Sequence, residues 1–396
     1  MASRKSTKQK SLRKICFVMT SFIHYSRNML IIEELKKRKD VELHLAIGGT
    51  ALLSRYVSKL ASLRALLEAD GFTNIHDVSF NLEGDSVVTK AKTTGLGTIE
   101  FAHLFGDIKP DVVVVRGDRF EVLSAALAAT YMNIPVAHIE GGDLSGSLDE
   151  STRHAITKLS HIHFATNEDA RKRIIRMGEH KKYVFNFGSP DIDVVKMISK
   201  KGSHTDLNQT GSGAFFDSKQ KYLMVMYHPV NSEVNKISEQ TRELLRAIHE
   251  LNMQTIWFWP NVDAGSEDIS HELRVFNNDV KDHKIRFMRY LPPKKFTTIL
   301  LNAQCLIGNS SAGIKECSYL GIPVVNIGTR QNNRLKGKNV MTVPHKRNAI
   351  KKAVTMQVRT GRYESSDLYL GKNTSKNIAT TLATIPLYIQ KKFHSH

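Results

Sequence analysis

The sequence predicts an α/β fold made of two Rossmann-like domains that face each other across a cleft. Short apolar runs alternate with helical patterns along most of the 396 residues, and this alternation is typical of parallel sheets covered by helices. Between residues 197 and 219 it dissolves into a stretch rich in Ser, Gly, Lys and Asn, which indicates a linker. The length also suits two domains of ordinary size better than one.

The first half begins with a strand over residues 14–19, and its later elements are recognised by their apolar patterns. Residues 112–115 are four consecutive valines, which favours a strand buried on both faces. Gly178 is a suitable residue to end a helix. The expected order is strand 14–19, helix 26–39, strand 42–47, helix 54–69, strand 111–115, helix 120–132, strand 136–139, helix 150–159, strand 162–165, helix 168–177 and strand 183–186.

The second half repeats the alternation after the linker. Its expected order is strand 222–227, helix 239–251, strand 255–259, helix 268–276, strand 285–288, helix 294–301, strand 305–307, helix 312–320 and strand 324–327. A last amphipathic stretch over 375–385 stops before Pro386 and can pack back across either half. The predicted organisation is a basic tail (1–13), a first domain (14–196), a linker (197–219), a second domain (220–374) and a returning helix (375–396).

The net charge of +19 is spread along the chain, with one basic concentration at the start. The first fourteen residues hold six Lys or Arg and no acid, with few apolar residues to bury, so residues 1–13 are expected to be disordered. Basic and aromatic residues are not interleaved, which argues against nucleic acid as a partner. A diffuse basic surface instead suits an enzyme that attracts diphosphate-bearing substrates.

Hydropathy and cysteine usage exclude two further classes of protein. No apolar run approaches the roughly 20 residues that span a bilayer, so no membrane partner is expected. Cys16, Cys305 and Cys317 form neither a pair motif nor a metal-ligand spacing. They are interpreted as buried, reduced thiols of a cytoplasmic protein, and no metal site is expected.

Charged side chains end two neighbouring strands of the first half. The valine run is followed by Arg116, Asp118 and Arg119, and the next strand ends in His138 and Glu140 beside two glycines. Open α/β sheets bind ligands outside the carboxyl ends of their strands. Two adjacent strands that deliver acids there predict a site in which carboxylates face a bound, anionic ligand.

A turn rich in small residues follows a strand of the second half, in the sequence Gly308-Asn-Ser-Ser-Ala-Gly313. Its backbone N–H groups and the hydroxyls of Ser310 and Ser311 can approach a phosphate at the start of a helix. Glu316 falls on that helix, where its carboxylate can accept both hydroxyls of a ribose, and Arg330 ends the next strand. The same turn also fits a capped helix start with no ligand.

Together these motifs resemble the hydrolysing UDP-N-acetylglucosamine 2-epimerases of sialic-acid-type sugar biosynthesis, which have the two-domain glycosyltransferase-B fold. The resemblance covers about residues 111–334, and its segments occur in the right order and at similar spacings. The matching segments are Gly117-Asp-Arg-Phe120, His138-Ile-Glu-Gly-Gly142, Asp149-Glu-Ser-Thr-Arg-His-Ala-Ile-Thr-Lys-Leu159, His228-Pro229, Pro260-Asn-Val-Asp-Ala-Gly265, Gly308-Asn-Ser-Ser311 and Gly328-Thr-Arg-Gln331.

The resemblance implies a two-step reaction on a UDP-sugar. The anomeric C–O bond to UDP breaks while the C2 proton leaves, which gives a 2-acetamidoglycal. Water then adds back with the opposite configuration at C2, and the products are N-acetylmannosamine and UDP. The family needs neither a metal nor another cofactor, and its members suggest a homodimer or homotetramer.

The family's catalytic positions are matched by Asp118, Glu140, Asp149 and His228. Three acids in one pocket should push their proton affinities apart, so that one acts as an acid while another is a base. We hypothesise that Asp118 and Glu140 act in the elimination and Asp149 in the hydration. The expected substrate-binding residues are His24, Tyr25, Arg119, Arg153, Asn261, Asp263, Ser310, Ser311, Glu316 and Arg330.

Several of these residues also have a purely structural interpretation. Asp118 and Asp149 can be N-caps of the helices that they precede, and His228 can be a satisfied core histidine. Arg153 lies one turn after Asp149, where a plain i,i+4 pair contributes little. Glu140 is harder to explain structurally, because a buried and unpaired acid is costly.

One departure from the family pattern concerns the loop expected after the first strand. Where the family has an arginine and an acid, this chain has Phe22 and His24, and it keeps Tyr25. A less polar sugar can rest against Phe22 and Ile23, so UDP-2,4-diacetamido-trideoxyhexose (legionaminic-type pathway) is an alternative substrate. A non-hydrolysing epimerase, a glycosyltransferase and a non-catalytic sugar-nucleotide-binding protein remain as other classes on the same scaffold.

Overall fold

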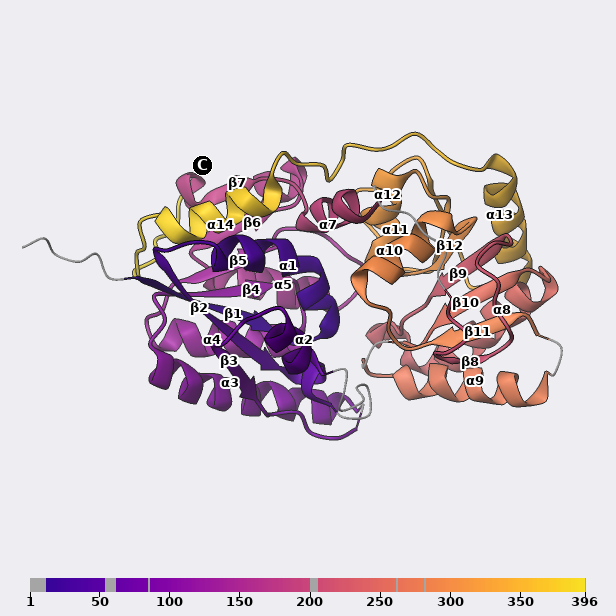
Figure 1. Ribbon diagram of the computed structural model, residues 1–396, viewed down its shortest axis with the longest axis horizontal. Coiled ribbons are helices and arrows are strands. Elements are labelled where there is room, and N and C mark those ends of the chain that lie inside the picture. The colour runs from indigo at the N-terminus through magenta and orange to yellow at the C-terminus, as the bar shows by residue number, and fades with distance from the viewer. Residues whose placement is uncertain are drawn as a thin grey trace, which may run out of the picture.

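The structure, a computed structural model, describes residues 12–53, 62–84, 86–199, 206–260, 263–280 and 283–395. They form two α/β domains that lie side by side (Figure 1), and the expected fold class is confirmed. The first domain contains β1 (Arg13–Met19), α1 (Phe22–Lys36), β2 (Val41–Gly48), η1 (Gly49–Leu52), α2 (Leu63–Ala69), β3 (Ile75–Val78), α3 (Val87–Ile108), β4 (Val112–Arg116), α4 (Phe120–Tyr131), β5 (Val136–Ile139), α5 (Asp149–Leu159), β6 (Ile162–Ala165), α6 (Glu168–Arg176), η4 (Lys181–Tyr183), β7 (Val184–Asn186) and α7 (Pro190–Ser199).

The second domain is built in the same way, and a last helix follows it. Its elements are β8 (Ser212–Gly213), β9 (Tyr222–Met226), η5 (Asn231–Lys236), α8 (Ile237–Glu250), β10 (Gln254–Phe258), α9 (Ser266–Asp279), β11 (Ile285–Met288), α10 (Pro293–Asn302), β12 (Cys305–Gly308), α11 (Ser311–Ile314), α12 (Glu316–Leu320), β13 (Val324–Ile327), β14 (Val340–Val343), α13 (Arg347–Thr360) and α14 (Thr374–Thr384).

Both sheets share one strand order, which fixes where a ligand can bind. The first sheet runs β3-β2-β1-β4-β5-β6-β7, and the second runs β14-β13-β12-β9-β10-β11-β8. Read from β11 to β14, the second sheet repeats the order of β3 to β6, with β9 in the place of β1. Strand β7 of the first sheet and the antiparallel edge strand β8 of the second have no counterpart. In such sheets the chain order reverses at one point, here between β1 and β4 and between β9 and β12, and ligands bind outside the carboxyl ends there.

The four valines of β4 show why the first sheet is stable. Val112 and Val114 pack into the cluster beneath α1 and α14, whereas Val113 and Val115 pack into the cluster beneath α3 and α4. All four are fully buried. Successive side chains of a strand point to opposite faces, so a run of valines is what a strand covered by helices on both sides requires.

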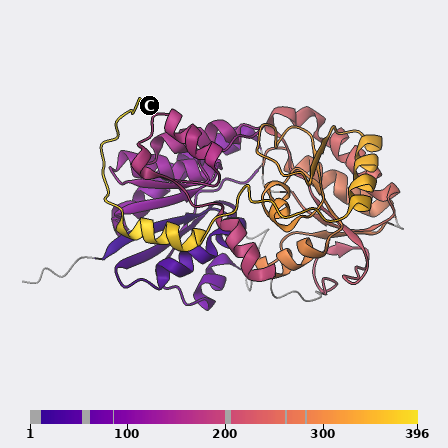
Figure 2. The same ribbon diagram turned by 90° about the horizontal axis from the view of Figure 1, so that it is seen from above.

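Helix α14 leaves the second domain and packs on the first. In Figure 1 it lies beside α1, at the far end of the molecule from α13, and Figure 2 shows the same placement from above. Ile378 and Leu382 are buried against Ile31 and Leu35 of α1, and the Arg13 guanidinium donates to the carbonyl of Leu382 at 3.0 Å. No helix among the described residues is both long and apolar enough to cross a lipid bilayer.

The structure corrects two expected boundaries. Helix α1 begins at Phe22 instead of residue 26, because the Ser21 side chain caps it by accepting from the His24 N–H, so residues 22–25 form a helical turn and not a loop. Residues 206–219, expected in the linker, pack on the second domain: β8 pairs with β11, and Phe216 is buried. Residues 1–11, 54–61 and 200–205 of the expected tail, helix and linker lie outside the described residues.

Candidate functional site

The candidate site lies where the two domains face each other with their strand ends. Residues after β4 and β5 in the first domain contact residues after β10, β12 and β13 in the second. Gly117 adopts a φ of 81° directly after β4, a conformation that costs glycine little. This turn places Asp118 at the reversal point of the strand order, next to the second domain.

Asp118 is held in place by Arg153 of α5, the helix that follows β5. It accepts a short hydrogen bond from the guanidinium of Arg153, which is 1% exposed and also donates to the Asp143 carbonyl. Burial alone would raise the pKa of Asp118, but the charges of Arg153 and Arg334 and the hydrogen bond from Arg153 together outweigh it, and the pKa is lowered. The N-cap residue of α4 is Arg119, so Asp118 is not the cap that the structural interpretation allowed.

Glu140 lies in the centre of a buried ion cluster. Its backbone has a φ of 73°, which is costly for a residue other than glycine and persists only where the surroundings impose it. Its carboxylate meets Arg116 at 3.1 Å, Lys315 at 2.5 Å and Arg334 at 3.4 Å. Burial opposes the charge, yet these cations lower the pKa of Glu140 well below its usual value.

Asp149 differs from the other two acids. It is the first residue of α5, and the N-cap residue is Leu148, so Asp149 is not the helix cap either. It accepts a hydrogen bond from the Ser147 hydroxyl at 3.0 Å, and the guanidinium of Arg330 from the second domain lies 3.8 Å from its carboxylate. Burial and the nearby Asp118 charge therefore raise the pKa of Asp149. Of the three predicted acids, Asp149 is the one that retains a proton most readily.

His228 follows β9 and is 4% exposed. Its backbone N–H donates to the Asn309 side chain at 2.8 Å, and the Asn309 amide donates back to the His228 carbonyl at 2.8 Å. This exchange ties the end of β9 to the turn after β12. Burial, followed by the Arg330 charge, lowers the pKa of His228 to about 3, so its imidazole is neutral near pH 7.

The expected phosphate turn is joined to the first domain by Arg27 of α1. Ser310 caps α11 by accepting from the Ala312 N–H at 3.3 Å. Arg27 donates to the Ser311 hydroxyl and to the Glu316 carboxylate, each at 3.2 Å. Burial raises the pKa of Glu316. The hydroxyl and the carboxylate expected to bind a nucleotide are therefore brought together, with an arginine from the opposite domain between them.

The remaining predicted residues are not all part of the domain interface. Arg119 contacts Asp263 across the domain interface at 3.3 Å, so these two belong to the site. The hydroxyl of Tyr25 instead donates to Asp70 within the first domain. Buried His24 accepts from the Thr20 N–H at 3.3 Å, and it lies beside the site, where burial and the nearby Arg119 charge lower the pKa of His24 to about 3. Asn261 lies outside the described residues.

Sequence reasoning missed the residues that join the two domains most tightly. Lys315 is fully buried, and its ammonium lies 2.5 Å from Glu140 and 2.6 Å from Asp191 at the start of α7. Asp191 also pairs with Arg116. The available signal was the position of Lys315, between the small-residue turn and Glu316. Asp191 gave no signal, because its partners come from distant parts of the chain.

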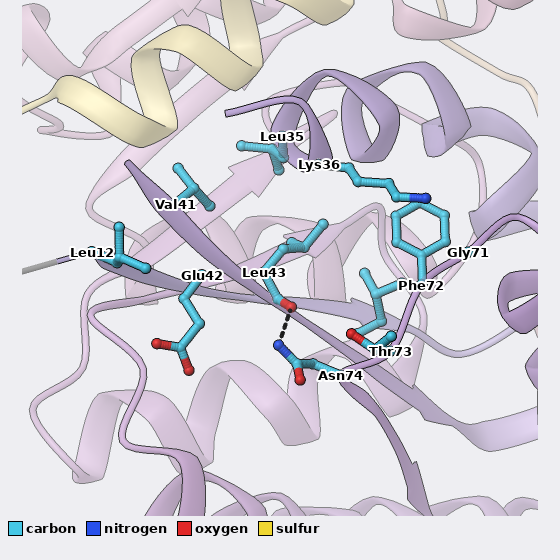
Figure 3. A pocket seen from close by; sticks show the side chains of 11 residues that line it. Leu12, Leu35, Lys36, Val41, Glu42, Leu43, Gly71, Phe72, Thr73 and Asn74 are labelled. Carbon is cyan, nitrogen blue, oxygen red and sulfur yellow. Dashed lines mark hydrogen bonds between the residues drawn. The ribbon is translucent and has the colours of Figure 1, made fainter. Parts of the chain in front are cut away.

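A pocket lies elsewhere on the first domain (Figure 3). It is lined by residues at the start of β2 and in the loop before β3, including Leu43 and Phe72, and the Asn74 amide donates to the Leu43 carbonyl there. This is the amino end of the parallel strands. The predicted acids lie at the opposite end, so this pocket is not part of the candidate site.

Comparison of the sequence with known proteins shows which family this chain resembles. A family model described as UDP-N-acetylglucosamine 2-epimerase matches residues 33–383. The chain is 33% identical over 380 residues to the UDP-N,N'-diacetylbacillosamine 2-epimerase (hydrolyzing) of Legionella pneumophila. This match covers 96% of this chain and 98% of the relative. It is 30% identical over 366 residues to the UDP-N-acetylglucosamine 2-epimerase of Neisseria meningitidis, with 92% of each chain covered.

Solved structures give the same fold. The crystal structure of the Neisseria meningitidis UDP-GlcNAc 2-epimerase bound to UDP-GlcNAc superposes with a TM-score of 0.75 at 18% identity, covering 93% of this chain and 99% of that one. The Methanocaldococcus jannaschii UDP-GlcNAc 2-epimerase in complex with UDP-GlcNAc and UDP gives a TM-score of 0.74 at 18% identity with the same coverage. At this identity the likeness supports the fold alone.

Proposed function

The chain belongs to the UDP-N-acetylglucosamine 2-epimerase family, and on that basis we propose that it is a hydrolysing 2-epimerase that converts UDP-N-acetylglucosamine to N-acetylmannosamine and UDP. One observation carries the proposal: three acids meet at the domain interface, and the pKa values of Asp118 and Glu140 are lowered while that of Asp149 is raised. A reaction that first removes and then returns a proton needs such a difference.

The first step is an elimination. Asp118 and Glu140 are ionised at neutral pH, so either can accept the proton from C2 as the electron pair forms the C1–C2 double bond. The anomeric C1–O bond breaks, and UDP leaves with that bond's electrons. Arg27, Arg119 and Arg330 reach this interface. Their positive charges stabilise the negative charge that develops on the diphosphate.

The second step is a hydration. Asp149 keeps its proton to higher pH than an ordinary aspartate, so we propose that it protonates C2 of the 2-acetamidoglycal from the opposite face. Water adds to C1 and gives its proton to one of the ionised acids. Neutral His228 can orient that water as a donor or an acceptor. The products are the free 2-epimeric sugar and UDP, and the sugar suits sialic or nonulosonic acid biosynthesis.

The Asp118→Asn variant should lose about 1,000-fold in kcat for UDP release, which is within the range for removing a general base. Asparagine keeps the shape of the side chain but cannot accept the C2 proton. The exposed Asp107→Asn substitution on α3 is the matched control and should leave kcat unchanged. A wild-type kcat in Asp118→Asn would assign the elimination to Glu140 alone.

A second substrate is favoured by one contact. The ring of Phe22, at the start of α1, lies 5.0 Å from the ring of Tyr290 in the second domain, so an aromatic pair stands where the family has a polar residue. The two rings form an apolar surface, which suits the methyl and acetamido groups of UDP-2,4-diacetamido-trideoxyhexose. The Legionella pneumophila relative is named for a sugar of this type.

Phe22→Arg tests that second substrate directly. If the aromatic pair holds the diacetamido sugar, the variant should lower kcat/KM for it about tenfold, the scale of one apolar contact in a binding pocket, without lowering kcat/KM for UDP-N-acetylglucosamine. Val88→Arg, at an exposed position of α3, controls for the added charge. Equal losses on both sugars would rule out a selective role for Phe22.

Product analysis tests the proposed function as a whole. The protein is incubated with each UDP-sugar, and the products are identified by ¹H and ³¹P NMR. Free N-acetylmannosamine, or its diacetamido counterpart, together with UDP supports the proposal. A UDP-linked epimer would indicate a non-hydrolysing epimerase, and unchanged substrate with retained UDP binding would indicate a non-catalytic binding protein.

A further inference from the structure

Gly146 brings the backbones of the two domains close together at the site. Its N–H donates to the carbonyl of Arg330 at 3.0 Å. A Cβ atom added to Gly146 would lie 1.9 Å from the carbonyl oxygen of Thr329 and 3.1 Å from Cβ of Asn332. The nearest obstacles to a side chain at Gly146 therefore belong to the other domain.

The loops that meet at Gly146 also carry charged groups of the site. In the first domain, the loop over residues 141–148 leads directly into α5, whose first residue is Asp149. In the second, residues 328–334 follow β13 and carry Arg330, which lies 3.8 Å from Asp149, and Arg334, which lies 3.2 Å from Asp143. We call these two loops, residues 141–148 and 328–334, the clasp.

We propose that Gly146 is a positioning residue that lets the clasp close and so places Asp149 for the hydration step. This inference rests on the proposed function. The φ of Gly146 lies outside the left-handed region, so alanine is compatible with the local backbone. Ordinary Cβ contacts begin at 3.4 Å instead of 1.9 Å, so a methyl group requires the two loops to part by about 1.5 Å.

A closed clasp keeps the 2-acetamidoglycal in the site and keeps Asp149 in position to protonate it. Asp149 sits at the end of its loop, so parting the loops moves its carboxyl away from Arg330 and from the sugar. A displacement of roughly 1 Å costs about 100-fold in rate when reacting groups must be aligned. With the clasp held open, the glycal can diffuse out before Asp149 protonates it.

The test compares Gly146→Ala and Gly146→Val with Gly95→Ala. Among the described residues, no heavy atom lies within 4 Å of a Cβ placed at Gly95 of α3, so this control adds the same methyl group without a contact. We expect formation of free N-acetylmannosamine to fall about 100-fold in kcat for Gly146→Ala and further for Gly146→Val. The Kd for UDP should stay at the wild-type value and the variants should remain folded at the assay temperature, while released 2-acetamidoglycal should rise.

The opposing outcomes are distinct. Wild-type kcat in Gly146→Val would overturn the inference, and so would a lowered thermal midpoint that accounts for the lost activity in Gly146→Ala. If wild-type protein turns over no UDP-sugar, the proposed function fails, but the clasp can still be tested by small-angle X-ray scattering with saturating UDP. The clasp then predicts a larger radius of gyration for Gly146→Val than for wild type, and equal radii would contradict it.

Discussion

The Asp149→Asn variant should release UDP and 2-acetamidoglycal but form free N-acetylmannosamine about 1,000-fold more slowly than the wild type. Removal of a general acid typically costs 10²- to 10⁴-fold. Asparagine fills the place of Asp149 but has no acidic proton to deliver to C2. Asp118 and Glu140 remain in this variant, so the elimination should persist.

Supplying 2-acetamidoglycal directly separates the two steps. The wild-type hydration rate should fall as the pH rises through the raised pKa of Asp149, because the acid must be protonated, and this dependence should disappear in Asp149→Asn. Exposed Asp107→Asn again serves as the control. Normal hydration of the supplied glycal by Asp149→Asn would overturn the division of roles among the three acids.

The Lys315→Met variant should be destabilised by about 3–5 kcal/mol, the cost of removing one partner from a buried ion pair. Lys315 is fully buried between Glu140 and Asp191. Methionine keeps much of the side-chain length but leaves both carboxylates short of a cation. The free energy of unfolding is measured by chemical denaturation at pH 7.

A second lysine provides the matched control for that measurement. Lys351 contacts Glu250 at 2.6 Å, but both side chains are about one third exposed, and such exposed pairs contribute little to stability because water and salt screen them. The pKa values of Glu140 and Asp191 are lowered in the folded state. Their stabilisation is therefore present above the usual carboxyl pKa and lost as the pH falls. Equal destabilisation by Lys315→Met and Lys351→Met would contradict the buried network.

The sequence allowed the site to be predicted wherever a strand carries its residues. The buried run of β4 and the charged residues after it specify a position at the end of a parallel strand, and the same holds for His228 after β9. Parallel strands end at a common edge, so local pattern and topology indicated a site near Asp118 and Glu140, whereas Asp149 and His228 were identified only by the resemblance to the family. The structure places the three acids at the domain interface and ties His228 to the turn after β12.

The contacts that join the domains could not be predicted in this way. Glu140 and Lys315 are 175 positions apart in sequence, and their pairing depends on how two separately built domains dock. The conformation of Glu140 likewise follows from the cations around it and not from its own preference. Gly146 gave no signal as one glycine among several, because what it excludes lies on the other domain.

Elements α3, β3, α7, β14 and α13 were not predicted from the sequence. The first two were missed for a local reason. Helix α3 contains three glycines and several β-branched residues, which weaken helix propensity. Its helical structure is supported by packing, since Phe101 and Phe105 are buried against the sheet. Strand β3 has only four residues, which is too short for its alternation to be distinguished from a loop.

The central claim is that one site removes the C2 proton and breaks the bond to UDP. Incubation with UDP-N-acetylglucosamine in deuterated water, followed by NMR of the free sugar, tests it most directly. The account predicts one deuterium at C2 of every N-acetylmannosamine molecule, formed together with one UDP. Free sugar that keeps protium at C2 would show that UDP is lost without the elimination and would contradict the account.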